Sequence, residues 1–173
     1  MNNNIMQNIF KNFQENIFPI GLIFILALAR LIPHPPNFTP IIAVAIMSSF
    51  FFKNIYLSIL VLLISMLLGD IFIGFYYNMI FVYLSLIFIV LIFFQVNKKI
   101  SFKSLFIFGF AGSFIFYLFS NFGVWMLGNL YSKDLKGLVE CYVLAIPFFK
   151  NTFFSTLIFS YSAYLVHNFY KKA

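Results

Sequence analysis

Long stretches without a charged side chain constrain this chain more than any other feature. Residues 71–97 and 104–132 contain no Asp, Glu, Lys or Arg and are rich in Phe, Ile and Leu. A membrane-spanning helix needs about 20 mostly apolar residues. Over all 173 residues, 63% are hydrophobic, 9% are charged and the mean hydropathy is +1.00, against about 45–50% apolar and about 25% charged in soluble domains. The sequence therefore predicts an integral membrane protein whose surrounding partner is the lipid bilayer.

The apolar segments predict an all-α bundle of about six transmembrane helices. They cover residues 17–32, 39–52, 55–75, 79–96, 102–119 and 144–167. The second segment is short for a full span and is interpreted as a half-helix or as chain lining a cavity. Residues 17–168 form one predicted domain, between a polar N-terminal tail (1–16) and a basic C-terminal tail (169–173).

The distribution of Lys and Arg predicts the orientation, because cytoplasmic loops carry an excess of positive charge. With both termini in the cytoplasm, seven of the basic residues fall inside: Lys11, Lys53, Lys98, Lys99, Lys103, Lys171 and Lys172. Four fall outside: Arg30, Lys133, Lys136 and Lys150. We therefore expect both termini to be cytoplasmic. Since the lysines flank apolar segments, no nucleic-acid partner is expected.

The same arrangement gathers uncommon polar and aromatic residues at the outer end. We predict a substrate-binding site from Arg30, His34, Asn37, Asp70, Asn121, Trp125 and Asn151. An acid inside a span costs about 2.5–3.5 kcal/mol on insertion scales and usually faces a partner or a cavity. The expected partner of Asp70 is Arg30, or else Lys150. Arg30 and Lys150 would also suit an anionic group such as a carboxylate.

Each of these residues also has a structural interpretation. Arg30 could extend to the lipid headgroups, and a pair with Asp70 could serve packing alone. His34 could cap a loop, the asparagines could satisfy broken-helix backbone, and Trp125 could anchor the interface. Four tyrosines are interpreted as interfacial residues: Tyr76, Tyr77, Tyr83 and Tyr131.

Motifs for catalysis and metal binding are missing from the sequence. It contains no GxSxG, HExxH or P-loop pattern, and its only other histidine, His167, is expected at the opposite end from His34. We therefore expect no catalytic residues, no metal site and no cofactor, and we do not expect an enzyme. Without a P-loop, any pumping would need a gradient or an energising partner.

Four strings in the sequence carry a resemblance to a known family. They are ARLIPHPPNFTP, LLGDIFIGF, SNFGVWMLGNLY and CYVLAIPFFKNT, and they lie within residues 25–155. The chain resembles a bacterial family of uncharacterised small membrane proteins described as putative transport proteins. That family is similar in size and helix count to the S components of energy-coupling factor transporters, which capture a solute and join a membrane scaffold with ATPases.

The resemblance implies a transport protein of the bacterial cytoplasmic membrane, with a scaffold subunit and ATPases as its partners. Together with the outer polar cluster, it predicts an S-component-like subunit that captures a small solute from the outer face. The alternative is a structural or assembly protein whose polar cluster stabilises helix packing. The solute and the energy source are left open.

Overall fold

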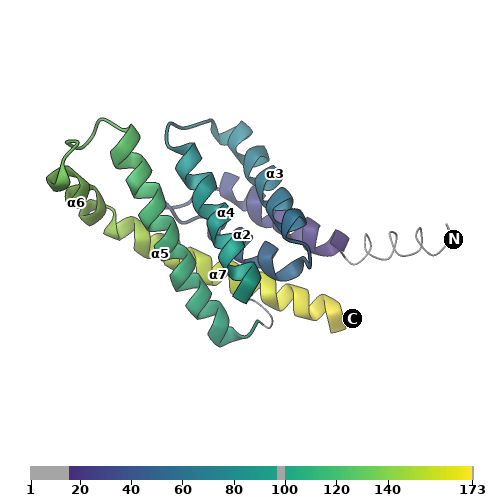
Figure 1. The fold of residues 1–173 in the computed structure, drawn as a ribbon. Helices are drawn as coiled ribbons and strands as arrows, with labels where there is room; N and C mark the ends of the chain where they lie inside the picture. The colour runs from purple at the N-terminus through teal and green to yellow at the C-terminus, as the bar shows by residue number, and fades with distance from the viewer. Residues whose placement is uncertain (1–15, 97–99, 173) are drawn as a thin grey trace.

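The computed structural model describes residues 16–96 and 100–172, and the regular structure in these ranges is helical (Figure 1). The predicted all-α class is therefore confirmed, whereas all but the last residue of the predicted polar tail lies outside the described residues. The N-terminal helix (Asn16–Leu31) ends in the 3-10 turn η1 (Ala29–Leu31). The other helices are α2 (Ile41–Phe51), α3 (Ile55–Ile73), α4 (Met79–Val96), α5 (Phe102–Leu127), α6 (Leu135–Leu144) and α7 (Ile146–Lys172).

The lengths of these helices decide how many could cross a membrane. Within the described residues, α3, α4 and α5 are long and apolar enough, and α6 with α7 forms a fourth candidate bent by 45°. The N-terminal helix and α2 are apolar but shorter. At about 1.5 Å per residue, α2 covers roughly half of a hydrocarbon layer about 30 Å thick. The predicted number of about six spans is not confirmed.

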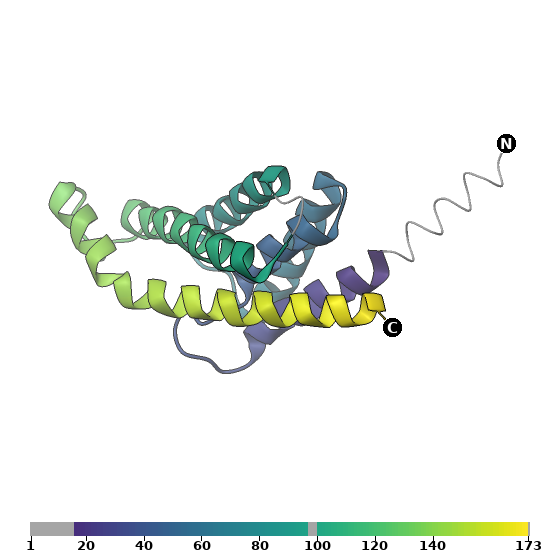
Figure 2. The same ribbon diagram turned by 90° about the horizontal axis from the view of Figure 1, so that it is seen from below.

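The structure differs most from the predicted helices in the region after Phe119. Helix α5 continues past Phe119 to Leu127, because the Asn121 side chain donates to the Tyr117 carbonyl 2.8 Å away and so fits inside a helix. The less apolar stretch after it contains α6, whose N-cap Asp134 accepts a hydrogen bond from the Gly137 N–H. Figure 2 shows α6 turning away from α7, which runs along the whole bundle.

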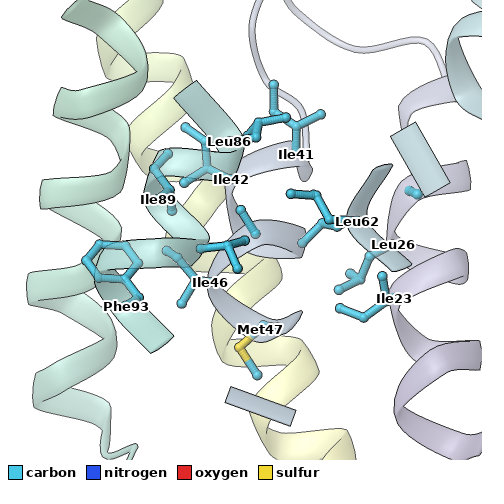
Figure 3. Packing of buried hydrophobic residues seen from close by; sticks show 14 of the residues in the cluster. Ile23, Leu26, Ile41, Ile42, Ile46, Met47, Leu62, Leu86, Ile89 and Phe93 are labelled. Carbon is cyan, nitrogen blue, oxygen red and sulfur yellow. The ribbon is translucent and has the colours of Figure 1, made fainter. Parts of the chain in front are cut away.

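Helix α2 forms the centre of the bundle. It packs against α3, α4, α5 and α7, and all of residues 41–49 are buried. Ile42 and Ile46 are fully enclosed and meet Leu86, Ile89 and Phe93 (Figure 3). A helix that is apolar on every side belongs inside a bundle, so α2 is an internal element in spite of its length.

Candidate functional site

The short central helix leaves space at one end of the bundle. Helices α3 and α5 end at this level, α4 and α7 begin there, and α2 starts only after the connection formed by residues 32–40 (Figure 1). A cavity of about 360 Å³ lies at this end. Its lining residues come from five helices and two connections: Arg30, Asn37, Thr39, Ile41, Tyr76, Asn78, Val82, Phe116, Ser120, Asn121, Val124 and Thr152. The volume lies in the range of small-molecule sites.

Arg30 and Asp70 form a buried ion pair beside this cavity. Arg30 Nη2 lies 2.7 Å from Asp70 Oδ1, and the side chains are 8% and 0% exposed. Arg30 Nη1 also reaches the Met66 carbonyl at 3.5 Å and its sulfur at 3.4 Å. Gly69 permits this approach, since a Cβ there would lie 3.1 Å from Arg30 Nη1. The pairing predicted from the cost of a charge in an apolar segment is confirmed.

Two tyrosines complete the surroundings of the ion pair. The Tyr83 hydroxyl donates to Asp70 Oδ2 at 2.7 Å, so both carboxylate oxygens have partners. Burial raises the pKa of Tyr76 to about 12, with the charge of Asp70 adding to the rise and Arg30 opposing it. Tyr76 also lines the cavity. Both tyrosines therefore contact the site, and their position at the membrane interface stays a prediction.

The connection formed by residues 32–40 is held against α7. Asn151 Nδ2 donates to the Pro36 carbonyl at 2.9 Å, and Thr152 Oγ1 to that of Asn37 at 3.3 Å. Ser155 Oγ donates to the Thr39 carbonyl at 3.0 Å. These donors fix the backbone that forms one side of the cavity.

The structure brings part of the predicted site together. Arg30, Asn37 and Asn121 line the cavity, and Asp70 lies behind Arg30 without lining it. Asn37 adopts a left-handed conformation with a φ of 60°, which asparagine tolerates better than most residues. Among the described residues, the side-chain amides of Asn37 and Asn78 make no hydrogen bond, so both keep their hydrogen-bonding capacity.

The other predicted residues lie outside the cavity lining. His34 is exposed, and its ring nitrogens face the carbonyls of Pro35 and Arg30 at 2.9 and 3.3 Å. Trp125 donates to the Ser132 carbonyl and lies under the Lys133 ammonium, 5.8 Å from the ring centre. Asn151 holds the connection, and Lys150 is exposed. The side chains of His34, Trp125 and Asn151 therefore support loops near the cavity.

Sequence reasoning missed several polar residues of the lining. Thr39 and Thr152 fall inside predicted helices, and Asn78 and Ser120 are adjacent to predicted helices. Thr39 is the first residue of the short second segment, and the shortness of that segment is the signal that could have identified this region. No group of three or more His, Cys, Asp or Glu residues that could hold a metal ion occurs in residues 16–96 and 100–172.

Fold and site together define a class: a helical bundle with several helices apolar enough for a membrane and a polar-lined cavity at one end. The chain belongs to a family of unknown function, DUF6580, which matches residues 10–173. No curated protein and no solved structure matches it.

Proposed function

We propose that this chain is an integral membrane protein that binds a small solute in the cavity beside Arg30. One observation carries the proposal: five segments of a very apolar chain bring polar side chains to one cavity of about 360 Å³. Polar groups at membrane depth are costly unless they have partners or a function. A cavity with a few convergent polar groups and apolar walls is the usual form of a small-molecule site.

The cavity opens toward the outer face in this proposal. At the opposite end of the bundle α2 and α7 end and α3 and α5 begin (Figure 1), so Lys53, Lys103 and Lys171 lie there. An excess of Lys favours the cytoplasmic side, and Lys11, Lys98 and Lys99 lie outside the described residues. Both termini are then cytoplasmic. The N-terminal helix and α2 act as two shorter apolar segments beside the longer spans, which gives six hydrophobic segments in all.

We propose that the bound solute is transported through the bacterial cytoplasmic membrane and that this chain is the S-component-like subunit that captures it. The support is the resemblance of the four sequence strings and a cavity at the end we assign to the outside. The partner would be a membrane scaffold with ATPases. Mild solubilisation of native membranes, affinity purification and mass spectrometry test this: ATPase subunits should co-purify, and a chain that purifies alone would contradict the partnership.

Solute binding itself is tested through the native ligand. The purified chain is extracted with solvent, and the small molecules released are compared with those from Val124→Phe. Because Val124 lines the cavity, the larger side chain should fill it and abolish the specific signal. The matched control is Val143→Phe, on an exposed position of α6, which should release the same molecules as the wild type. Identical extracts from both variants would refute the proposed site.

The second candidate is a structural protein in which the polar cluster only stabilises helix packing. It is favoured because the Asp70 carboxylate already has all its partners within the protein. Both carboxylate oxygens are occupied by Arg30 and Tyr83, and Asp70 has no exposed surface. Replacing Arg30 and Asp70 together by leucine separates the candidates, since a buried ion pair can often be exchanged for apolar residues without loss of stability. If the variant keeps its stability but loses solute binding, the ion pair belongs to the binding site. If the variant is stable and still binds the solute fully, the pair has a structural role.

A further inference from the structure

The beginning of α2 is a buried helix end without a side-chain cap. Its N-cap is Pro40, and no side chain of the described residues donates or accepts a capping hydrogen bond there. Ile41 is 7% exposed, and Ile42 and Ala43 are fully buried. The first N–H groups of a helix have no partner within it and carry the positive end of its dipole. Because Thr39 and Ile41 line the cavity, this positive end adjoins it.

Arg30 adds a second positive group that is independent of α2. Its side chain is more than nine-tenths buried and lines the same cavity. Its Nε has no hydrogen-bond partner among residues 16–96 and 100–172, so the guanidinium keeps donor capacity. Asp70 balances the charge but does not line the cavity. The cation is therefore the member of the ion pair next to the space, and the anion lies behind it.

The polar side chains from α5 and α7 have the opposite character. Ser120 Oγ donates to the Phe116 carbonyl at 2.7 Å, and Asn121 Nδ2 to that of Tyr117 at 2.8 Å. Thr152 Oγ1 donates to the Phe148 carbonyl at 2.9 Å. The hydroxyl hydrogens of Ser120 and Thr152 and one of the two amide hydrogens of Asn121 are used in contacts within the protein, so the side-chain oxygens are left to accept hydrogen bonds from a ligand. Arg30 packs on α3, whose main packing partners are α2, α4 and η1 rather than α5 and α7.

From this polarity we infer that the solute is a small organic carboxylate with a hydroxyl or N–H donor at its other end. The carboxylate lies against Arg30 and the first turn of α2, and the donor faces Ser120, Asn121 and Thr152. This inference rests on the proposed function and names its ligand class. The apolar part of the lining, from Ile41, Val82, Phe116 and Val124, fits a compact hydrocarbon or aromatic body between the two polar ends.

Three matched probes test the two ends of this ligand. Binding of para-hydroxybenzoate, para-hydroxybenzamide and benzoate to the full chain in nanodiscs is measured by calorimetry at neutral pH. The amide removes the charge and should bind about 10- to 100-fold more weakly, as expected when a hydrogen-bonded charge is lost. Benzoate lacks the hydroxyl and should bind about tenfold more weakly. An amide that binds as tightly as the acid would overturn the inference.

A variant tests the role of α2 directly. Pro40→Asp places a carboxylate at the N-cap, where it should satisfy the first-turn N–H groups and compete with the ligand. We expect at least about tenfold weaker binding of para-hydroxybenzoate. The control is Pro33→Asp, which adds the same charge at an exposed position of the same connection and should leave binding unchanged.

Two failures are then distinguishable. If the native-ligand extraction finds a solute and the three probes bind equally or not at all, the carboxylate inference is wrong and the binding function stands. If the extracts of wild type and Val124→Phe are identical and no probe binds, both are wrong. The probe series alone decides the inference if Pro40→Asp does not fold.

Discussion

The two ends of the bundle bury polar side chains in opposite ways. At the cavity end, Asp70 has partners on both oxygens and open volume lies beside Arg30. At the other end His167 is 5% exposed, and among the described residues its Nδ1 has no partner. Rings enclose it: the centroids of Phe51 and Phe50 lie 4.4 and 6.0 Å away. Partnered charge with free space suits a binding site, whereas a ring packed among aromatic residues suits the core.

The largest expected effect is the loss of Asp70. Asp70→Ala leaves Arg30 as a buried charge without its anionic partner, which costs about 3–5 kcal/mol. The free energy of unfolding is measured by denaturant titration in mixed micelles. The double leucine variant at positions 30 and 70 should recover most of this loss. If Asp70→Ala lowers the free energy of unfolding only slightly, the cavity end does not depend on its ion pair more than the other end depends on His167.

Tyr83→Phe should have the next largest effect. It removes the hydroxyl that donates to Asp70 Oδ2, and a hydrogen bond to a charged group contributes about 1.5–3 kcal/mol. The same denaturant titration applies. Tyr56→Phe is the matched control, because Tyr56 is 81% exposed and its substitution should leave stability unchanged. Equal effects of the two changes would mean that Tyr83 does not stabilise the carboxylate.

Gly69→Ala tests how closely Arg30 must approach α3. The new methyl group would lie 3.1 Å from Arg30 Nη1, and overpacking of this kind costs about 1–3 kcal/mol. Gly21→Ala is the control in the N-terminal helix, since no atom lies within 4 Å of its added Cβ. Alanine favours helix over glycine there, so this control should be neutral or stabilising in thermal unfolding. Destabilisation by both would indicate a general glycine effect.

The smallest effect is expected at His167. His167→Phe keeps an aromatic ring of similar size among Phe51, Phe50 and Phe18 and removes an unpartnered polar atom. Volume-conserving exchanges of this kind change stability by less than about 1.5 kcal/mol. Thermal unfolding checks the value. A loss as large as that of Asp70→Ala would show that both ends depend on their polar groups equally.

The cost of charge in an apolar segment made one contact of the site predictable. Arg30 and Asp70 had to find partners, and they pair with each other. The same reasoning assigned a membrane depth to His34, Trp125 and Asn151, but depth does not specify which way a side chain faces. These three instead bind the backbone of nearby connections.

Helix lengths were less predictable where polar residues interrupt apolar ones. The less hydrophobic stretch that begins at Asn121 suggested that a helix ended near Phe119, yet Asn121 donates to the carbonyl four residues earlier and the helix continues. Gly123 is needed for packing, since a Cβ there would lie 2.6 Å from the Phe81 ring. The polarity of the sequence therefore gave the wrong end for α5. Hydrogen bonds within the helix and packing against α4 allow the helix to continue through polar and small residues.

The attachment of residues 32–40 to α7 affects the order in which the parts of the cavity come together during synthesis. Its three hydrogen bonds join residues 115 or 116 positions apart. During synthesis from the N-terminus, the connection emerges long before the helix that holds it. This segment contains four prolines, which lack an N–H group: Pro33, Pro35, Pro36 and Pro40. It therefore has few backbone N–H groups that lack a partner before α7 is in place. The cavity is completed only when the last helix docks, and a chain truncated before Asn151 would lack it.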